Sequence, residues 1–366
     1  MRPAASMKTE TAFGSGRAAL LGLEDAGRAR KPWIAGTITA RDRVVPVVST
    51  RLSRNDAWGG VKVRWNIGRD QYSVLPGLYA AGAPAAESPV LVTANYKLSF
   101  DTLRRNLEGI DAWILVLDTK GINVWCAAGK GTFGTRELEK RIITVRLDQI
   151  VSHRTLILPQ LGAPGVSAPE VKKATGWTVK YGPVRAEDIR TYLSAGQKKD
   201  EAMRKVRFAL ADRMAVAPVE LTQAWPLLLG ILAASALIGL PFSTGYAQRL
   251  LQLLLPLVGG VLAAVFGFPA LLPYLPFRAF ALKGAVLGMA WGIASALLVG
   301  ASAAAGAGLV LLVSPIAAFI AMSFTGASTF TSQPGAALEV RRGIIPMAAS
   351  LAAGIVLTVL ARLFAL

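Results

Sequence analysis

The stretch DAWILVLDTKGINVWCAAGKGTFGT, Asp111 to Thr135, joins a short apolar run to a glycine-punctuated segment that holds the chain's only cysteine, Cys126. The apolar run has the length and composition of a strand buried on both faces of a sheet. A lone cysteine in apolar company is usually a small, inert, buried residue. Where the fold places Cys126 therefore decides between a packing role and a functional one.

Apolar runs alternate with helical patterns on both sides of this stretch. Upstream, residues 33–80 combine Val, Ile, Thr and Tyr with Gly and Pro breaks, which predicts a hairpin-rich entry segment. Strands are then expected in SPVLVTANY, DAWILVLDTKG, RTLILPQLG and WTVKYGPV, and helices in LSFDTLRRNLEGI, GTRELEKRIITV, PEVKKATG and RAEDIRTYLSAG. This alternation predicts a Rossmann-like α/β domain with a mainly parallel sheet between helical layers.

Three loops are expected to leave the carboxyl ends of these strands: residues 93–97, 121–131 and 159–170. Ligands of such sheets bind beyond the carboxyl ends of the strands. Cys126 is therefore expected in the ligand-binding position of the fold, beside two other loops rich in Gly, Pro, Ala and Asn.

The segment AAGKGTFGT superficially resembles a phosphate-binding loop. Its spacing fails, because Val124 stands where the first glycine is needed and Gly131 stands where the hydroxyl residue is needed. The run of small residues would instead let a large flat ligand approach the backbone. One thiolate is too few for a metal held by protein alone, but it suffices for a metal caged by a macrocycle that lacks an axial donor.

The composition describes two different halves. The chain has 366 residues, a net charge of +18, 53% hydrophobic residues and a mean hydropathy of +0.46. Residues 1–220 hold 34 basic and 21 acidic residues, whereas the remainder holds six and one. The single cysteine excludes a disulfide within the chain and a zinc or iron-sulfur site built from its own cysteines. His153, the only histidine, excludes sites that need several imidazoles.

The back half is predicted to be an all-α membrane domain. Uncharged runs of about 20 residues predict five spans, near 224–242, 249–268, 283–301, 307–325 and 344–364. Basic residues gather before the first span, between the second and third, and at Arg341 and Arg342 between the last two. The positive-inside rule then places the front half in the cytoplasm and the C-terminus outside the cytoplasmic membrane. With no ionisable residue in mid-span, an anchor is favoured over an ion path.

The expected domain boundaries follow from these patterns. Residues 1–32 show no secretory signal and are expected to be a flexible leader. Residues 33–197 form the α/β domain, residues 198–220 a basic linker, and residues 221–366 the transmembrane domain.

The segment NVWCAAGK, Asn123 to Lys130, resembles the signature of the mercury-methylation corrinoid proteins, the HgcA family. The blocks PGLYAAGAP, SPVLVTANYKLSFDTLR, RTLILPQLGAPGVSA and YGPVRAEDI resemble the same family in order, and a five-span membrane domain is expected of it. More distantly, the front domain is similar to the corrinoid domain of the corrinoid iron-sulfur protein of the acetyl-CoA pathway. That relative carries cluster cysteines which this chain lacks.

The resemblance implies a corrinoid-dependent methyltransferase. The family binds cobalamin or a related corrinoid in the base-off form, and Cys126 would be the catalytic residue and the lower axial ligand of cobalt. A methyltetrahydrofolate-type donor, or its methyltransferase, would supply a methyl group that passes to Hg(II), forming methylmercury. The partners implied are membrane lipid and the ferredoxin-like iron-sulfur protein HgcB, as electron donor and possible mercury donor. No nucleic acid is expected.

The expected cofactor-binding residues lie in three loops. Asn123 is expected to cap a helix, and Phe133 and Trp113 are assigned to the core. Lys130 is left open between a cofactor contact and a solvated lysine. The full set is Thr93, Asn95, Asn123, Val124, Trp125, Cys126, Ala127, Ala128, Gly129, Lys130, Gly131, Gly162 and Ala163.

Two other functions remain open from the sequence. The first is a corrinoid methyl carrier of one-carbon metabolism in the acetyl-CoA pathway, with a different acceptor. The second is a transporter or membrane receptor whose front domain senses a ligand; the absence of charge within the predicted spans counts against it.

Overall fold

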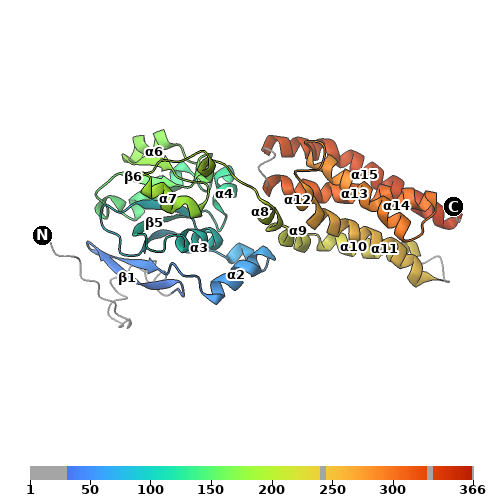
Figure 1. Ribbon diagram of the computed structural model, residues 1–366, viewed down its shortest axis with the longest axis horizontal. Coiled ribbons are helices and arrows are strands. Elements are labelled where there is room, and N and C mark those ends of the chain that lie inside the picture. Colours follow the sequence, from blue (N-terminus) through green and yellow to red (C-terminus); the bar gives the residue numbers. More distant parts are fainter. Residues whose placement is uncertain (1–30, 240–244, 328–332, 365–366) are drawn as a thin grey trace. The chain divides into compact units, whose positions relative to one another are not determined.

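A computed structural model describes residues 31–239, 245–327 and 333–364 (Figure 1). The expected leader, residues 1–32, lies almost wholly outside the described residues. The chain divides into two compact units, with the main boundary between Val206 and Arg207.

The described part of the front unit contains a seven-stranded sheet in the order β1-β2-β3-β5-β4-β6-β7. Strands β5, β4, β6 and β7 run parallel, β3 is antiparallel to β5, and β1 and β2 form an antiparallel hairpin. The predicted Rossmann-like, mainly parallel sheet is therefore confirmed. The strands are β1 (Ile34–Ala40), β2 (Arg43–Val48), β3 (Gly77–Ala81), β4 (Val90–Ala94), β5 (Ala112–Leu117), β6 (Thr155–Leu158) and β7 (Thr178–Tyr181).

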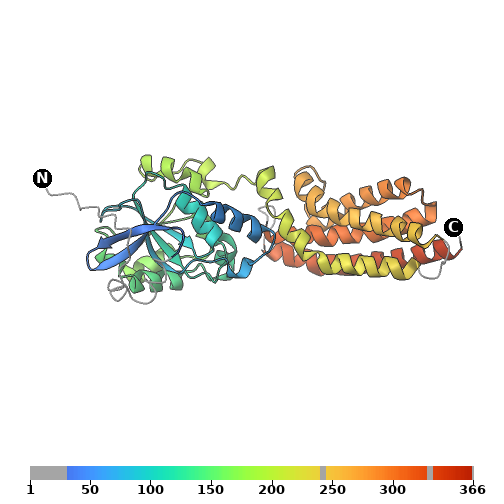
Figure 2. The same cartoon turned by 90° about the horizontal axis from the view of Figure 1, so that it is seen from below.

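Helices cover both faces of this sheet (Figures 1 and 2). Helices α3 (Lys97–Arg105) and α7 (Ile189–Ser194) pack on one face, and α4 (Val124–Lys130), α5 (Thr135–Thr144) and α6 (Ala168–Thr175) pack on the other. Along β5, Trp113 and Leu115 face one helical layer while Ile114 and Val116 face the other. This double burial explains why the strand is apolar at successive positions.

The strand order creates a switch point between β4 and β6. From β4 the chain crosses through α3 to β5 on one side, and from β5 it crosses through α4 and α5 to β6 on the other side. The ladder between β4 and β6 joins only Val90 to Leu156 and Leu91 to Ile157. Beyond that pairing the carboxyl ends separate, which is where doubly wound sheets bind ligands.

The entry segment differs from its prediction. The hairpin β1–β2 and strand β3 form, but α2 (Arg54–Arg64) and a 3-10 turn, η1 (Arg69–Gln71), occupy the region between them, where strands were expected. The physical reason is a reciprocal cap: Ser53 Oγ accepts from the Asp56 backbone N–H at 3.1 Å, and Asp56 Oδ2 accepts from the Ser53 N–H at 2.9 Å. Such a box starts a helix despite the following Gly59 and Gly60.

The expected basic linker is partly helical. It contains the 3-10 turn η5 (Ala202–Arg204) and the short helices α8 (Leu210–Met214) and α9, which runs Ala217–Gln223. Three further 3-10 turns lie in the loops of the front unit: η2 (Leu147–Gln149), η3 (Gln160–Gly162) and η4 (Ala186–Asp188).

In the described ranges, the back unit has four helices long and apolar enough to cross a membrane, Tyr246–Leu271, Phe280–Leu298, Ala303–Ser323 and Gly335–Leu363. A fifth span is present if Leu210–Gln223 and Trp225–Ile238, bent by 52°, count as one. The elements are α10 (Trp225–Gly239), α11 (Tyr246–Leu262), the π-helical turn η6 (Ala263–Gly267), α12 (Phe268–Leu271), α13 (Phe280–Leu298), α14 (Ala303–Ser323), η7 (Phe324–Ala327) and α15 (Gln333–Leu363). By length and composition, the described residues thus contain four or five candidate spans.

One detail of the membrane prediction is wrong. Arg341 and Arg342 were assigned to a connecting loop, but α15 already begins at Gln333 and both residues lie within it. Glu339, the only acid after Glu220, also lies on this part of α15. Its Oε2 accepts from the Phe280 and Ala281 backbone N–H groups at 2.8 and 3.1 Å. The carboxylate on α15 thereby caps the start of α13.

Small residues set the helix spacing in the back unit, whose helices run alongside each other (Figure 2). A Cβ at Gly284 or Gly288 of α13 would lie 2.5 to 2.8 Å from atoms of Ala321 and Ala317 on α14. Close backbone approach of this kind is typical of membrane helices. Large apolar side chains such as Leu297 and Ile345 are exposed on the outside of the back unit.

Candidate functional site

The site is built around α4, which follows the loop of residues 118–123 after β5 and whose first turn is fixed by Asn123. Asn123 Oδ1 accepts from the Cys126 backbone N–H at 2.9 Å, so the predicted helix cap is confirmed. Gly131 ends the helix with φ of 80°, a conformation that favours glycine. Asn123 starts the helix and Gly131 ends it, so α4 has seven residues.

Helix α4 has a buried face and an exposed face. Val124, Ala127 and Ala128 are buried in the core, whereas Cys126, Gly129 and Lys130 are exposed. The three exposed positions follow the i, i+3, i+4 spacing and so share one side of the helix. The thiol of Cys126 therefore faces outward from a surface with little side-chain bulk, and the inert, buried alternative is excluded.

The loop after β6 supports α4. A Cβ at Gly165 would lie 2.1 Å from the Phe133 carbonyl oxygen and 2.9 Å from the Ala128 Cα, both of which are backbone atoms. Gly162 is buried against the Phe133 ring, and Ala163 is half-buried. In the structure these residues position α4, and the predicted cofactor contacts of Gly162 and Ala163 stay predictions. Gly165 was missed because its role depends on a contact distant in sequence.

The two predicted residues of the β4 loop have different surroundings. Thr93 is 4% exposed and lines a cavity. Asn95 is buried, and its Oδ1 accepts from the Thr119 N–H at 3.0 Å, the Thr119 hydroxyl at 2.8 Å and the Gly121 N–H at 2.9 Å. Asn95 therefore holds the loop that leads into α4. The remaining predicted core residues, Trp113 and Phe133, are fully buried, as expected.

A cavity of about 390 Å³ opens at the switch point beside α4. Its walls come from the ends of β4 and β6, the starts of α3 and α4, and the segment 182–189. Asn123, Val124 and Trp125 form the α4 side, and Cys126 is the next residue along the helix but not part of the lining. The walls are mainly apolar, with Thr93, Thr102, Asn123 and Arg185 among the polar contributions. A volume of this size lies within the usual range of small-molecule sites.

Charged residues brace the loop between β5 and α4. Glu137 Oε1 accepts from the Asp118 backbone N–H at 2.9 Å and pairs with Arg141 at 2.7 Å. Burial acts to raise the pKa of Asp118, but hydrogen bonds from Lys120 outweigh it, and the net pKa is below the ordinary value. Asp118 is therefore a carboxylate that fixes the loop rather than a proton donor near neutral pH.

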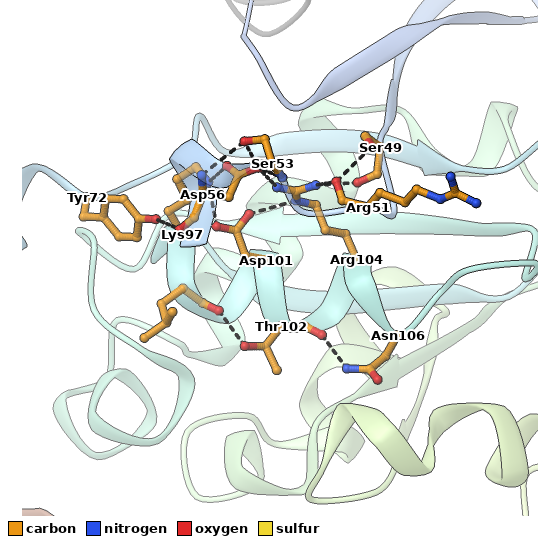
Figure 3. A network of polar contacts seen from close by, with 11 residues as sticks. Ser49, Arg51, Ser53, Asp56, Tyr72, Lys97, Asp101, Thr102, Arg104 and Asn106 are labelled. Carbon is orange, nitrogen blue, oxygen red and sulfur yellow. Dashed lines mark hydrogen bonds and ion pairs between the residues drawn. The ribbon is translucent and has the colours of Figure 1, made fainter. Parts of the chain in front are cut away.

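The residues that the sequence analysis missed form a buried ionic network between α2 and α3. Lys97 Nζ lies 2.6 Å from Asp56 Oδ1 and 2.5 Å from Asp101 Oδ2. Arg104 pairs with the same two carboxylates, at 2.9 Å from Asp56 Oδ2 and 2.8 Å from Asp101 Oδ1. Figure 3 shows the four side chains pointing toward one another. The spacing of Lys97, Asp101 and Arg104 on one helical face was the available signal.

This network shifts the ionisation of its neighbours. Burial acts to raise the pKa of Asp56, but hydrogen bonds from Lys97 and Ser53 hold it well below the usual range. The pKa of Tyr72 is raised to about 12, first by burial and then by the charges of Asp101 and Asp56. Asp56 is thus a permanent carboxylate and Tyr72 a neutral phenol at physiological pH.

No group of three or more His, Cys, Asp or Glu side chains within the described ranges is placed to hold a metal ion. Among those residues Cys126 is a free, solvent-facing thiol. A metal at this position would need ligands from another source, such as a macrocycle.

Comparisons with known proteins match the front unit. Residues 64–193 match the family model of the CO dehydrogenase/acetyl-CoA synthase delta subunit. Acetyl-CoA decarbonylase/synthase complex subunit gamma of Methanopyrus kandleri is 35% identical over 127 residues, which cover 34% of this chain and 27% of that protein. The same subunit of Archaeoglobus fulgidus is 33% identical over 138 residues, covering 36% and 29%.

The corrinoid/iron-sulfur protein large subunit of Moorella thermoacetica is 32% identical over 116 residues, covering 31% of this chain and 26% of that protein. The chain therefore spans about a quarter of the length of the curated relatives it matches. The expected similarity to the corrinoid iron-sulfur protein is confirmed for the front unit. Residues 64–193 thus match the family of the CO dehydrogenase/acetyl-CoA synthase delta subunit, and 116 residues of the chain are similar to a corrinoid/iron-sulfur protein.

Proposed function

We propose that this chain is a membrane-anchored, corrinoid-dependent methyltransferase that takes a methyl group from a methyltetrahydrofolate-type donor and delivers it to Hg(II). The observation that carries the proposal is the outward thiol of Cys126 on α4, beside the switch-point cavity of a domain related to corrinoid proteins. The mercury-specific part rests on the NVWCAAGK signature around that thiol.

The residues around Cys126 fit a base-off corrinoid. Gly129 has no side chain and Cys126 is small, so the exposed face of α4 offers a flat surface for a macrocycle. The cavity begins at Asn123 and Trp125, where mainly apolar walls suit the aromatic base of a nucleotide tail. The exposed residues of α4 would thus hold the macrocycle, and the cavity residues contributed by β4, β6 and the start of α4 would hold its tail.

When bound, the corrinoid would supply a cobalt centre that carries the methyl group, and a thiolate ligand would donate electron density to it. The residues of this chain would hold the cofactor in place by fixing the position of α4. Asn123 fixes the first turn of α4. Buried Ala127 and Ala128 anchor one face of α4 in the core, and Gly165 packs directly against its backbone. Lys130, exposed at the end of α4, would meet an amide or phosphate of the cofactor in this proposal.

The proposed partners are those that would supply the electrons and the Hg(II) that the reaction needs. A methyl group delivered to Hg(II) would carry its bonding electron pair with it, so two electrons would have to come from outside this chain before the next methyl group is taken up. A ferredoxin-like iron-sulfur protein such as HgcB would provide them and hand over Hg(II). The proposed location is the cytoplasmic membrane, with the front unit in the cytoplasm. Five crossings, counting the bent pair 210–238 as one, would place the C-terminus outside.

The second candidate is a corrinoid methyl carrier of one-carbon metabolism with another acceptor. It is favoured by the similarity to subunits of acetyl-CoA decarbonylase/synthase complexes. The two candidates share the site and differ only in what accepts the methyl group, so they are separated by the product.

The test uses the full chain, purified in detergent and reconstituted with cobalamin under reducing conditions. We expect an absorption spectrum of thiolate-ligated cobalt, which Cys126→Ala abolishes and which Ile143→Ser, a change at an exposed apolar position of α5, leaves intact. With a methyl donor, a reductant and Hg(II), methylmercury should form. Methylated cofactor that never loses its methyl group to Hg(II) supports the carrier, and a chain that binds no cobalamin refutes both proposals.

A further inference from the structure

Helix α2 carries its large apolar side chains on its outer face. Trp58 is 59% exposed and Val61 is 42% exposed, and Trp65, just beyond the last residue of α2, is 42% exposed. Positions 58 and 61 are three apart and share one side of the helix, and Trp65 follows in the turn after it. Ile67, 61% exposed, continues the apolar surface. We call Trp58, Val61, Trp65 and Ile67 the α2 outer face.

The inner face of α2 offers little hydrophobic contact. Its buried residues are Asp56, Gly60 and Val63, and Gly59 lies against the ring of Tyr72. The helix is instead held by charge: Asp56 is clamped between Lys97 and Arg104, and Arg104 Nη1 also donates to the Ser49 carbonyl oxygen at 2.5 Å (Figure 3). An ordinary surface helix shows the reverse arrangement, with apolar side chains inside.

The buried network fixes α2 rigidly in this orientation. Lys97 also lies under two rings, with Nζ 4.5 Å from the Trp33 centroid and 5.4 Å from the Tyr72 centroid. A firmly held helix and the turn after it that expose two indoles present them to a partner outside the front unit's core. The nature of that partner is indicated by the surrounding charges.

Residues 51–69 contain five basic residues and one acid, and the acid, Asp56, is neutralised inside the network. Arg51 pairs with Glu108 at 3.4 Å on the surface, and the segment still keeps a net positive charge. Lys62 lies over the ring of Trp58, with Nζ 5.9 Å from its centroid, so cation and indole share the same surface. The basic residues are Arg51, Arg54, Lys62, Arg64 and Arg69.

We propose that the α2 outer face lies in the lipid–water interface of an anionic bilayer. Indole rings bordered by Lys and Arg are the combination that peripheral helices use there, because the ring fills the headgroup boundary while the cation meets a lipid phosphate. The described part of the same chain carries four or five helices able to cross a bilayer, so the chain itself tethers the front unit to such a surface. The inference rests on the proposed membrane location and not on corrinoid chemistry.

The experiment places a nitroxide label on the full chain in lipid nanodiscs. Cys126→Ser removes the only native thiol, and Trp58→Cys or Ile143→Cys then provides a single labelling site. Ile143, 68% exposed on α5, is the matched control. Collision with oxygen, which partitions into lipid, is compared with collision with a water-soluble nickel chelate, in discs of phosphatidylcholine with and without phosphatidylglycerol.

We expect the oxygen-to-nickel collision ratio at position 58 to rise several-fold in anionic discs, and the ratio at position 143 to stay at its aqueous value. Arg54→Gln with Lys62→Gln should weaken the association on the order of fivefold for each charge removed. Equal, water-like ratios at both positions in every disc overturn the proposal. A label at 58 shielded from both reagents, with or without anionic lipid, also overturns it and identifies a protein as the partner.

A second readout keeps the test valid if the cysteine variant folds poorly. Brominated anionic lipid should quench the fluorescence of the unmodified chain more than that of the Trp58→Phe/Trp65→Phe variant. Equal quenching of the two proteins contradicts the proposal. Neither measurement involves cofactor or methyl transfer, so its failure is distinguishable from failure of the proposed function.

Discussion

Replacing Lys97 by methionine removes one of four charges buried between α2 and α3 and leaves Asp56 and Asp101 facing Arg104 alone. The side chains of the network are all at least nine-tenths buried, so water cannot replace the missing ammonium group. Breaking a buried ionic network in this way costs about 3–5 kcal/mol. That cost is a large part of the roughly 5–15 kcal/mol that stabilises a typical folded protein.

The assay is hydrogen–deuterium exchange of the full chain in detergent, followed at the peptides of α2 and α3. A loss of about 3–5 kcal/mol accelerates exchange through local opening by roughly a hundredfold to several thousandfold. Lys205→Met is the matched control, because Lys205 and Glu201 form an ion pair of similar length on the surface. Exposed pairs contribute about 0–1 kcal/mol, so the control should change exchange little.

Restoring charge balance should recover stability. In the double variant Lys97→Met/Asp101→Asn one carboxylate again faces one guanidinium, and the amide oxygen introduced at position 101 can still accept from Arg104. We expect the double variant to exchange more slowly than Lys97→Met. If Lys97→Met exchanges like the Lys205→Met control, the network does not hold α2 and the reasoning is refuted.

The pH dependence of this variant follows from Asp56. Its pKa in the folded chain lies below the unfolded value of about 3.9, so its contribution is complete above about pH 4 and is lost as the pH falls further. Lys97→Met removes the main partner that lowers this pKa. The stability gap between the native chain and Lys97→Met should therefore narrow below about pH 4, which thermal unfolding followed from neutral to acidic pH would detect.

The remaining predictions concern α4 and its supports. Gly165→Ala should displace α4 at a cost of about 1–3 kcal/mol and weaken cobalamin binding, measured by absorption titration. Gly36→Ala is the control, because a Cβ added there meets open space, and it should change neither stability nor binding. Asn123→Ala should fray α4 at a cost of about 0.5–2 kcal/mol, and unchanged exchange at Cys126 would contradict its role as cap. Asn95→Ala should speed exchange in residues 118–122, because three hydrogen bonds to that loop are lost; equal exchange would show that the loop is held otherwise.

The sequence predicted the strands and helices of the sheet well because their patterns are local. The runs at Val90–Ala94 and Ala112–Leu117 are apolar at every position except Thr93, and only a strand covered on both faces requires this. The Asn123 cap is likewise a signal between residues three apart. The outward direction of Cys126 followed from its place in the topology rather than from its apolar neighbours.

The sequence failed where distant contacts decide the structure. Gly59 and Gly60 suggested a turn between strands, but the Ser53–Asp56 cap and the ion pairs of Asp56 with α3 favour a helix. Gly165 carries no local signal, because its importance comes from the Phe133 and Ala128 backbones that lie against it. The first predicted span, near 224–242, begins where α10 begins, but hydropathy gave no sign of the 52° bend that joins α10 to residues 210–223 before it.

A solitary outward thiol also fixes how the chain behaves toward reagents. Because Cys126 is the only cysteine, a maleimide or mercurial reagent labels only that thiol. The number of labels per chain therefore gives the fraction of chains in which Cys126 is accessible. Air oxidation of such a thiol has no partner within the chain, so it joins two chains or proceeds to a sulfenic acid. A preparation that resists both alkylation and cross-linking is therefore one in which something already covers that sulfur.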